Sequence, residues 1–271
     1  MDEVLNKIFN EDCLIGMDKI PDKSIDCIIC DLPYGKLNHL GWDVLIPFEK
    51  LWQQYNRIAK DNAAILLFGV EPFTSAIVMS NVKNYRQKLT WLKNKPSNIF
   101  NAKKQFMNWT EDIIVFYRHL PTFNPQMIFK NQKPKKPFSK VHENQGGVYG
   151  RCGSHSGYIT DNGGYVYPKS VLEFGNYTGF LEKDKKYHHP TKKPVDLIRY
   201  LIRTYTNPGD LVLDNCMGSG TTAIAAIREN RNFIGFELDK NFYDICQQRI
   251  DDEANYVEQE KQESNPDNSL F

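Results

Sequence analysis

The chain has almost no net charge, no long hydrophobic run and few cysteines. Its 34 Lys and Arg residues face 33 Asp and Glu, so a net charge of +1 indicates no class of partner. The longest apolar run, Ala63–Val70, has eight residues and is far too short to span a membrane. The start of the sequence, Met1–Val4, is acidic and lacks the basic-then-apolar order of a signal peptide. We therefore expect a cytoplasmic protein without a membrane span.

The six cysteines lack the arrangement that metal or redox chemistry needs. Cys27 and Cys30 form a CxxC pair, but they lie inside the apolar run Ile25–Cys30 and no second pair of metal ligands accompanies them. Buried cysteines of a strand are the simpler interpretation. We expect no metal site and a reducing compartment.

Charge is distributed unevenly along a chain of ordinary composition. A length of 271 residues with 41% hydrophobic side chains fits one large folded α/β domain with room for a small insertion. From Arg118 to Lys193 there are 13 Lys or Arg against five Asp or Glu, a balance of +8. From Asp251 to Phe271 there is one against seven, a balance of −6. The neutral total thus combines a basic middle with an acidic tail.

Short apolar runs alternate with segments of helical periodicity. Strands are predicted at Ile25–Cys30, Ala63–Phe68, Ile113–Tyr117, Leu211–Leu213 and Phe233–Phe236. Helices are predicted at Pro47–Lys60, Pro194–Tyr205 and Asp239–Ile250. Several of the strands are apolar throughout, which is typical of parallel strands covered on both faces. The alternation predicts an α/β fold with a doubly wound, mostly parallel sheet.

The middle of the chain follows a different pattern. From Leu120 to Lys186 helical periodicity disappears, and glycine and tyrosine accumulate, as in Gly146–Gly150 and Gly163–Tyr165. A structureless loop of this length is unusual inside a compact domain. We interpret the segment as an inserted recognition module of short strands. After Asp251 the sequence is polar, and we expect a frayed tail there.

The sequence Asp31-Leu32-Pro33-Tyr34 follows the first predicted strand directly. It places a carboxylate, a backbone carbonyl and an aromatic face at one point, which are the groups needed to hold a planar base by its amino group. Two other interpretations stay open. Asp31 could cap a helix, although Pro33 disfavours one there, and Tyr34 could be an ordinary packing residue with its hydroxyl satisfied.

A second motif lies far downstream, where Leu211–Asp214 leads into Gly218-Ser219-Gly220 and a helix beginning near Thr221. Such glycines let a backbone approach a ligand closely, and a helix amino terminus favours an anionic group. Glu237 follows Gly218 by 19 residues at the tip of the next predicted strand, a spacing suited to ribose hydroxyls. The alternative is a tight turn without a ligand. A dinucleotide loop is disfavoured because Ala223 stands where its third glycine belongs.

These motifs resemble those of the DNA amino-methyltransferases that use S-adenosyl-L-methionine, in the permuted order called beta. In that family an Asp-Pro-Pro-Tyr motif comes first, a target-recognition region follows, and the cofactor glycine loop comes last. Two further segments match the family, His189–Pro194 and Asn10–Leu14, so the resemblance covers roughly residues 8–117 and 188–250. One position departs from the pattern, since Leu32 stands where the family has proline.

The resemblance implies a Rossmann-like methyltransferase fold with an inserted target-recognition region. Its catalytic half is expected at residues 1–118, the recognition insertion at 119–187, the cofactor-binding half at 188–250 and an acidic polar tail at 251–271. In the implied reaction a methyl group passes to the 6-amino group of an adenine flipped out of duplex DNA. Adenine is favoured over cytosine because Asp rather than Ser opens the motif at Asp31.

The resemblance also implies site residues. The catalytic set is Asp31, Leu32, Pro33 and Tyr34, with the Asp31 carboxylate and the Leu32 carbonyl accepting hydrogen bonds from the amino group and Tyr34 stacking on the base. The cofactor set is Asp12, Cys13, Thr191, Lys193, Asp214, Cys216, Gly218, Ser219, Gly220, Thr221 and Glu237. Lys193 is expected near the methionine carboxylate, with an exposed surface lysine as the alternative.

Double-stranded DNA is the expected partner. Five lysines of the basic middle suit phosphate contacts: Lys130, Lys133, Lys135, Lys136 and Lys140. The resemblance further implies a protein of bacterial or phage origin, a homodimer, and a cognate restriction endonuclease in a restriction-modification system. Other interpretations stay open, namely methylation of the 4-amino group of cytosine, methylation of adenine in RNA, and a catalytically silent DNA-binding relative.

Overall fold

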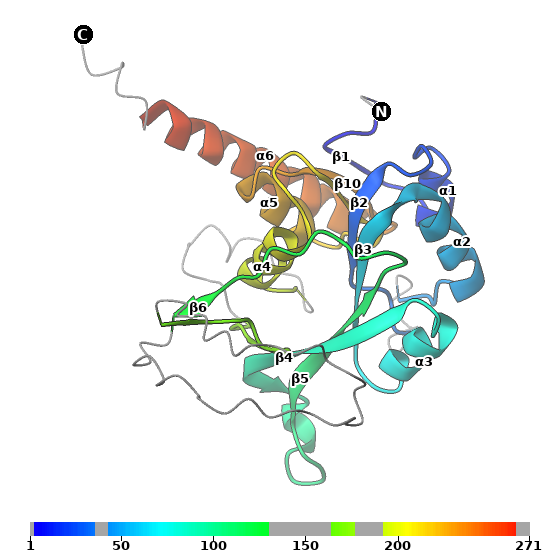
Figure 1. The fold of residues 1–271 in the computed structure, drawn as a ribbon, viewed down its shortest axis with the longest axis vertical. Coiled ribbons are helices and arrows are strands. Elements are labelled where there is room, and N and C mark those ends of the chain that lie inside the picture. The colour runs from blue at the N-terminus through cyan, green and yellow to red at the C-terminus, as the bar shows by residue number, and fades with distance from the viewer. Residues whose placement is uncertain (1–2, 36–42, 130–163, 177–191, 264–271) are drawn as a thin grey trace, which may run out of the picture. The chain divides into compact units, whose positions relative to one another are not determined.

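The computed structural model describes residues 3–35, 43–129, 164–176 and 192–263 (Figure 1). The chain divides into two compact units, residues 1–124 with 170–271 and residues 125–169. The larger unit holds an eight-stranded sheet in the order β1-β10-β9-β2-β3-β5-β4-β8. The strand bounds are β1 Lys7–Phe9, β2 Ile25–Cys30, β3 Ala59–Gly69, β4 Tyr85–Ser97, β5 Asn108–Phe116, β8 Val171–Glu173, β9 Leu211–Asp214 and β10 Asn232–Phe236.

Each of the five predicted strands is present, and the predicted doubly wound, mostly parallel sheet is confirmed. The strands β1, β10, β9, β2 and β3 pair in parallel. The run Ile113–Tyr117 gives β5, which is antiparallel to both neighbours, β3 and β4. Its residues Ile113–Phe116 are nevertheless fully buried, because helices cover both faces of the sheet here. An uninterrupted apolar run therefore indicates that a strand is buried on both faces, but it does not indicate whether the strand is parallel or antiparallel to its neighbours.

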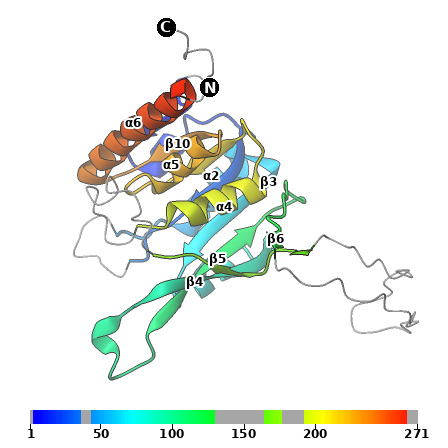
Figure 2. The same ribbon diagram turned by 90° about the vertical axis from the view of Figure 1, so that its left-hand side faces the viewer.

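Strands β4 and β5 form a long hairpin that extends beyond the layers of the sheet (Figure 2). A short 3-10 helix, Ile99–Asn101, lies near its turn. On the other edge of β4, the strand β8 pairs in parallel, so residues 171–173 of the predicted insertion belong to the main sheet.

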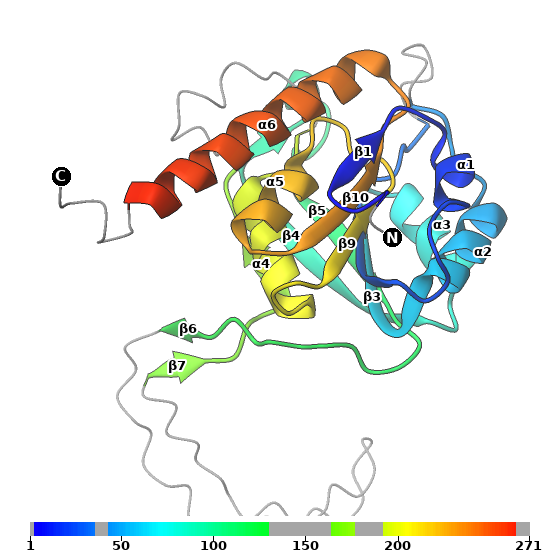
Figure 3. The same cartoon turned by 90° about the horizontal axis from the view of Figure 1, so that it is seen from above.

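Helices cover the two faces of the sheet in separate layers (Figure 3). On one face lie α1 (Cys13–Met17), α2 (Phe48–Ile58) and α3 (Phe73–Ser80), and on the other lie α4 (Val195–Tyr205), α5 (Thr221–Arg228) and α6 (Lys240–Glu263). The predicted helices at Pro47 and Pro194 begin where expected, since each proline is the residue just before the first helical turn. Both helices turn their apolar stripes, centred on Tyr55 and Leu201, into fully buried positions.

The helix α6 continues to Glu263, so the expected frayed tail after Asp251 is wrong for residues 251–263. Its first half is anchored by the buried side chains of Cys246 and Ile250. Arg228 of α5 donates two hydrogen bonds to Glu253, from Nε to Oε1 at 2.7 Å and from Nη2 to Oε2 at 2.8 Å. This bidentate pair holds the helix one turn beyond the apolar anchor, which the polar sequence does not reveal.

In the smaller unit, β6 (Ile128–Phe129) and β7 (Tyr165–Val166) form a two-stranded antiparallel sheet. The rings of Phe129 and Tyr165 pack with their centroids 5.2 Å apart. The part of the segment from residue 130 to 163 lies outside the described residues. Within the described ranges, no helix has both the length and the apolar composition to cross a membrane.

Candidate functional site

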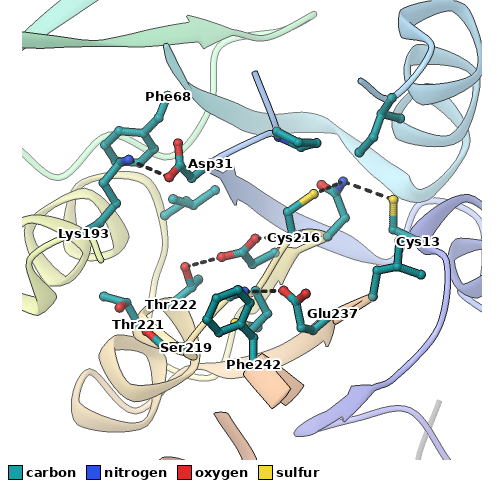
Figure 4. A pocket seen from close by; sticks show the side chains of 18 of the residues that line it. Cys13, Asp31, Phe68, Lys193, Cys216, Ser219, Thr221, Thr222, Glu237 and Phe242 are labelled. Carbon is teal, nitrogen blue, oxygen red and sulfur yellow. Dashed lines mark hydrogen bonds and ion pairs between the residues drawn. The ribbon is translucent and has the colours of Figure 1, made fainter. Parts of the chain in front are cut away.

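Four neighbouring strands deliver chemically active side chains to one edge of the sheet. Because β10, β9, β2 and β3 run in parallel, their carboxyl ends meet at this edge, which brings Glu237, Asp214, Asp31 and Phe68 together. The chain leaves β9 toward α5 on one face and leaves β2 toward α2 on the opposite face. Such a switch between adjacent parallel strands opens a crevice, and open α/β sheets bind their ligands there. A cavity of about 480 Å³ occupies this position (Figure 4).

The structure brings the two predicted motifs to this single cavity. Its lining includes eleven of the predicted site residues: Asp12, Cys13, Asp31, Pro33, Lys193, Asp214, Cys216, Gly218, Ser219, Thr221 and Glu237. Leu32, Tyr34 and Gly220 lie directly beside lining residues in the chain. Thr191 and the five lysines predicted to bind DNA, Lys130, Lys133, Lys135, Lys136 and Lys140, lie outside the described residues.

Asp31 is held by two donors, one on each carboxylate oxygen. The Tyr34 hydroxyl donates to Oδ1 at 2.7 Å, and the Lys193 ammonium donates to Oδ2 at 2.5 Å. Residues 31–35 are not helical, so the interpretation of Asp31 as a helix cap is wrong. The carboxylate side chain is 27% exposed and faces the cavity, where it retains lone pairs for a further donor.

Lys193 extends this contact into a chain of alternating charges. Its Nζ also lies 3.2 Å from Glu111 Oε2, and Lys93 Nζ lies 3.2 Å from Glu111 Oε1. The two ammonium groups balance the two carboxylates, so the buried cluster has no net charge. Since the Lys193 side chain is only 10% exposed, the alternative of a surface lysine is wrong.

Lys193 and Glu111, in the middle of this row of ion pairs, are stabilised in their ionised states by their neighbours. Burial acts to lower the pKa of Lys193, but the carboxylates of Asp31 and Glu111 outweigh it and raise that pKa. Burial acts to raise the pKa of Glu111, but the ammonium groups of Lys193 and Lys93 outweigh it and lower that pKa. Lys193 and Glu111 therefore both carry their full charge near neutral pH.

The rest of the catalytic motif is packed firmly. Leu32 is 3% exposed and belongs to the core under α2, so the leucine that departs from the family pattern supplies apolar contacts. The Tyr34 ring packs against Phe73 with centroids 4.8 Å apart. Burial, followed by the nearby Asp31 charge, raises the pKa of Tyr34 well above its usual value. Tyr34 is thus a neutral donor to Asp31.

The glycine loop wraps around the Glu237 carboxylate. Gly218 donates its backbone N–H to Glu237 Oε2 at 2.7 Å, and Asp239 donates its N–H to Oε1 at 2.8 Å. Gly218 and Gly220 have φ angles of +54° and +85°, the left-handed region that glycine adopts without strain. Burial raises the pKa of Glu237, and its carboxylate forms part of the cavity wall.

Asp214 closes the base of the loop. It accepts from the Thr222 hydroxyl at 2.6 Å and from the Cys216 N–H at 3.1 Å, so it ties the end of β9 to the first turn of α5. Burial raises its pKa to about 6, although both hydrogen bonds act in the opposite direction. These two hydrogen bonds give Asp214 a structural role in the loop.

The segment before α1 forms the opposite wall. Asp12 caps α1 by accepting the Leu14 N–H at 2.7 Å, and Cys13 is buried. Asn215 joins the two segments, since its side-chain amide lies 3.6 Å from Cys13 Sγ while its Oδ1 accepts from the Tyr55 hydroxyl at 2.5 Å. The amino-terminal segment and the glycine loop are thus fixed through buried polar contacts.

Several residues of the site are absent from the predicted set. Phe68, Asn215 and Phe242 line the cavity, and Glu111 joins the ion-pair chain. Phe68 lies near the carboxyl end of a buried strand, and its ring lies 5.2 Å from Lys193 Nζ. A signal for Phe68 exists in the sequence, because the carboxyl end of a predicted parallel strand points to this edge. Glu111 has no such signal, since its partners come from distant segments.

The cavity suits the cofactor that the sequence resemblance implies. Its volume falls in the usual range for small-molecule sites. The Glu237 carboxylate can accept hydrogen bonds from ribose hydroxyls, and the glycine backbone at Gly218 lets a ligand approach closely, so this wall suits a nucleoside. Aromatic and apolar side chains, including Phe242 and Leu238, provide the rest of that wall.

Comparisons with known proteins find similar sequences along most of the chain. A family model described as DNA methylase matches residues 25–248. The type II methyltransferase M1.MboII of Moraxella bovis is 29% identical over 88% of this chain and 94% of its own length. The DNA adenine methyltransferase YhdJ of Escherichia coli K12 is 26% identical over 93% of this chain and 85% of its own length.

Two solved structures share the fold. The crystal structure of an M1.HpyAVI–SAM complex has a TM-score of 0.59 at 24% identity and covers 90% of this chain and 98% of its own. The PvuII DNA methyltransferase, described as cytosine-N4-specific, has a TM-score of 0.61 at 18% identity and covers 93% of this chain and 92% of its own.

The loop geometry makes a testable prediction with a matched control. A Cβ at Gly220 would lie 2.6 Å from Cys246 Sγ, whereas one at Gly209, whose φ of +86° is nearly the same, would meet nothing within 4 Å. We expect Gly209→Ala to lower the free energy of unfolding by about 1 kcal/mol through backbone strain alone. Gly220→Ala should cost about 1–3 kcal/mol more through the clash. Urea denaturation of both variants measures the difference, and equal destabilisation would contradict the packing of α6 on the loop.

Asp214 gives a second prediction, for pH. A carboxyl whose pKa is raised to about 6 in the folded state binds more protons there than in the unfolded chain, whose value is near 3.8. Its contribution to stability is full below about pH 3.8 and is lost as the pH rises through about 6. In Asp214→Asn the slope between about pH 3.8 and 6 should become less negative, whereas Asp196→Asn, at a 60% exposed side chain, should leave it unchanged. Urea denaturation at a series of pH values measures the free energy of unfolding and hence the slope. An unchanged slope in Asp214→Asn would contradict the raised pKa of Asp214.

Proposed function

The chain belongs to the DNA methylase family whose model matches residues 25–248, which makes it an S-adenosyl-L-methionine-dependent DNA methyltransferase, and from this premise we propose that it methylates the 6-amino group of an adenine flipped out of duplex DNA. The observation that carries the proposal is the meeting of Asp31 and Gly218 on the wall of one cavity. One motif then holds the base and the other holds the methyl donor within reach of it.

The target nitrogen needs activation because its lone pair is delocalised into the adenine ring. The Asp31 carboxylate and the Leu32 backbone carbonyl accept hydrogen bonds from the two amino protons. These bonds strengthen as positive charge develops on the nitrogen, so they favour the transition state over the ground state. The Tyr34 hydroxyl holds Oδ1 of Asp31, and its ring offers the base a stacking partner backed by Phe73.

The cofactor would be held by the opposite part of the cavity. S-adenosyl-L-methionine supplies a methyl group that is already activated on a sulfonium. Glu237 binds the ribose hydroxyls, and the loop Gly218–Gly220 packs against the methionine part. Asp12 and Cys13 lie toward the adenine ring, and Asn215 keeps that wall in place through Tyr55.

Lys193 is a positioning residue in this proposal. It fixes Oδ2 of Asp31 at 2.5 Å and is itself fixed by Glu111 at 3.2 Å, so the carboxylate keeps both its charge and its orientation. Glu111 and Lys93 complete the chain and cancel the remaining charge. A neutral cluster matters because an uncompensated cation here would oppose the positive charge that develops on the target nitrogen.

Two observations support adenine over cytosine. The motif opens with Asp31, the form commoner among adenine enzymes of the family. YhdJ, described as a DNA adenine methyltransferase, aligns over 93% of the chain. Methylation of cytosine or of RNA would use the same carboxylate, and the assay below separates them. A homodimer, a cognate endonuclease, a cytoplasmic location and a recognition role for residues 119–187 stay predictions.

The decisive experiment identifies the methylated nucleoside. The protein is incubated with labelled S-adenosyl-L-methionine and, in separate reactions, with mixed DNA or with RNA; the nucleic acid is digested, and 6-methyladenine from the DNA is expected to carry the label. Asp31→Ala should abolish transfer while leaving cofactor binding, measured by calorimetry, nearly intact. The control is Asp22→Ala, which lies before β2 at the other edge and is 72% exposed. Label in cytosine, RNA or protein would overturn the substrate, and full turnover by Asp31→Ala would overturn its role.

Lys193→Met tests the positioning role. Without the ammonium, the carboxylates of Asp31 and Glu111 lose the cation between them, so the acid limb of the pH–activity profile should move to higher pH and kcat should fall about tenfold. Lys193→Arg should restore part of both. The control Lys60→Met removes an ion pair with Asp26, 2.6 Å long, at the other end of the sheet's parallel strands. A weaker cofactor affinity with an unchanged pH profile would instead place Lys193 on the methionine carboxylate.

A further inference from the structure

We infer that residues 97–108, the tip of the β4–β5 hairpin, form a surface that contacts duplex DNA beside the catalytic cavity. The inference rests on the proposed function, because it takes a base in duplex DNA as the substrate. Hereafter these residues are called the hairpin tip. They lie outside the basic segment 119–187 and outside the residues that line the cavity.

The strand directions place the hairpin tip at the catalytic edge. Strand β5 is antiparallel to both β3 and β4, so β4 runs in the same direction as β3 and β2. The carboxyl end of β4 therefore lies at the edge where Asp31 follows β2. Lys93 of β4 and Glu111 of β5 join the ion-pair chain that ends on Asp31. The hairpin tip thus begins four residues beyond a side chain of the catalytic network and projects outward (Figure 2).

The hairpin tip exposes large apolar side chains that the fold does not use. Phe100 and Phe106 are 102% and 98% exposed, and Ile99 is 63% exposed. Scattered exposed apolar residues are ordinary on a protein surface, but two fully exposed phenylalanines in the turn of one hairpin mark a contact surface. Both rings are therefore available for contact with a partner.

The positive charge in and around the hairpin tip favours a polyanion as the partner. Residues 94–109 contain Lys95, Lys103 and Lys104 and no Asp or Glu, in a chain whose totals nearly balance. All three lysines are exposed. Aromatic side chains interleaved with basic ones suit a polyanion that offers stacked rings. A second copy of the chain fits less well, because the cores of protein interfaces are depleted in lysine.

The base of the hairpin is fixed, so the hairpin tip is presented in a defined position. Asn176, just after β8, donates its backbone N–H to Asn94 Oδ1 at 2.8 Å and its side-chain amide to the Lys95 carbonyl at 2.8 Å. Trp91 adds a hydrogen bond from Nε1 to the Phe174 carbonyl at 2.8 Å. Within the hairpin tip, a left-handed φ of +70° at residue 98 turns the chain into the short 3-10 helix.

These features divide the roles within the hairpin tip. Lys103 and Lys104 bind phosphates, and Phe100 and Phe106 contact the bases next to the position that the flipped adenine leaves. Removing a base from the stack exposes the faces of its neighbours, and an aromatic side chain replaces part of the stacking that extrusion removes. The phenylalanines should then matter most where extrusion is hardest, in fully paired duplex.

Two double variants and two controls test the inference. Phe100→Ala with Phe106→Ala removes the rings, and Lys103→Ala with Lys104→Ala removes the charges. Met79→Ala with Val82→Ala removes apolar groups that are 72% and 56% exposed before β4, at the opposite edge. Lys83→Ala is the matched charge control there. The substrate is a duplex carrying the site mapped on DNA methylated by the wild-type enzyme, and a second duplex carries a mismatch opposite the target adenine.

For the phenylalanine variant we expect kcat/KM on the paired duplex to fall about tenfold, and the mismatched duplex to restore most of it. For the lysine variant the slope of log Kd against log salt should fall by about 0.9 for each phosphate that the variant leaves unneutralised. Both controls should match the wild type. If both double variants keep wild-type kinetics and salt slope, the inference is wrong.

Two other outcomes would overturn the inference in recognisable ways. A phenylalanine variant that changes from dimer to monomer in sedimentation, with unchanged DNA affinity, would assign the hairpin tip to an interface between copies. If the wild type methylates no DNA at all, the proposed function fails first. The hairpin tip is then still tested by duplex affinity alone, and an unchanged Kd and salt slope in both double variants would reject it.

Discussion

Parallel pairing of β9 with β2 is the constraint on which the rest of this site depends. The two strands come from opposite ends of the chain, yet their register places Asp214 and Asp31 at one edge of the sheet. Because the described parts of the following segments leave toward opposite faces, none of the described helices covers the gap between the two strands. The cavity is therefore a consequence of connectivity, and the motifs on its walls give it chemistry.

The ion pairs from Asp31 through Lys193 and Glu111 to Lys93 connect neighbouring segments at that edge of the sheet. It joins the loop after β2, the segment just before α4 and the strands β4 and β5, which are distant in sequence. Isolated buried charges are costly, but four alternating charges compensate one another, and removing one leaves its neighbours unpaired. The same ion pairs that hold the strands also set the charge and direction of the Asp31 carboxylate. Stability and catalysis thus share these side chains.

The hairpin made by β4 and β5 extends this arrangement outward. Its base carries Lys93 and Glu111 of the network, and its far end carries exposed phenylalanines and lysines. An antiparallel pair is suited to this task, since a two-stranded ribbon can project from a sheet while its inner part stays hydrogen-bonded. The hydrogen bonds of Asn176 at the base keep that projection in register with the cavity.

Local elements and both motifs can be predicted from the amino-acid order alone. Apolar runs mark the strands, prolines mark the starts of α2 and α4, and the spacing from Gly218 to Glu237 marks the cofactor loop. The direction of β5 cannot be predicted in this way, because burial on both faces looks alike in parallel and antiparallel strands. The ion pairs of Lys193 with Glu111 and Asp31 likewise exist only in the folded molecule. The same is true of the hydrogen bonds from Arg228 to Glu253 that stabilise α6 beyond its apolar part. Local propensity acts within a few residues, whereas a buried ion pair exists only when the folded sheet brings its partners together.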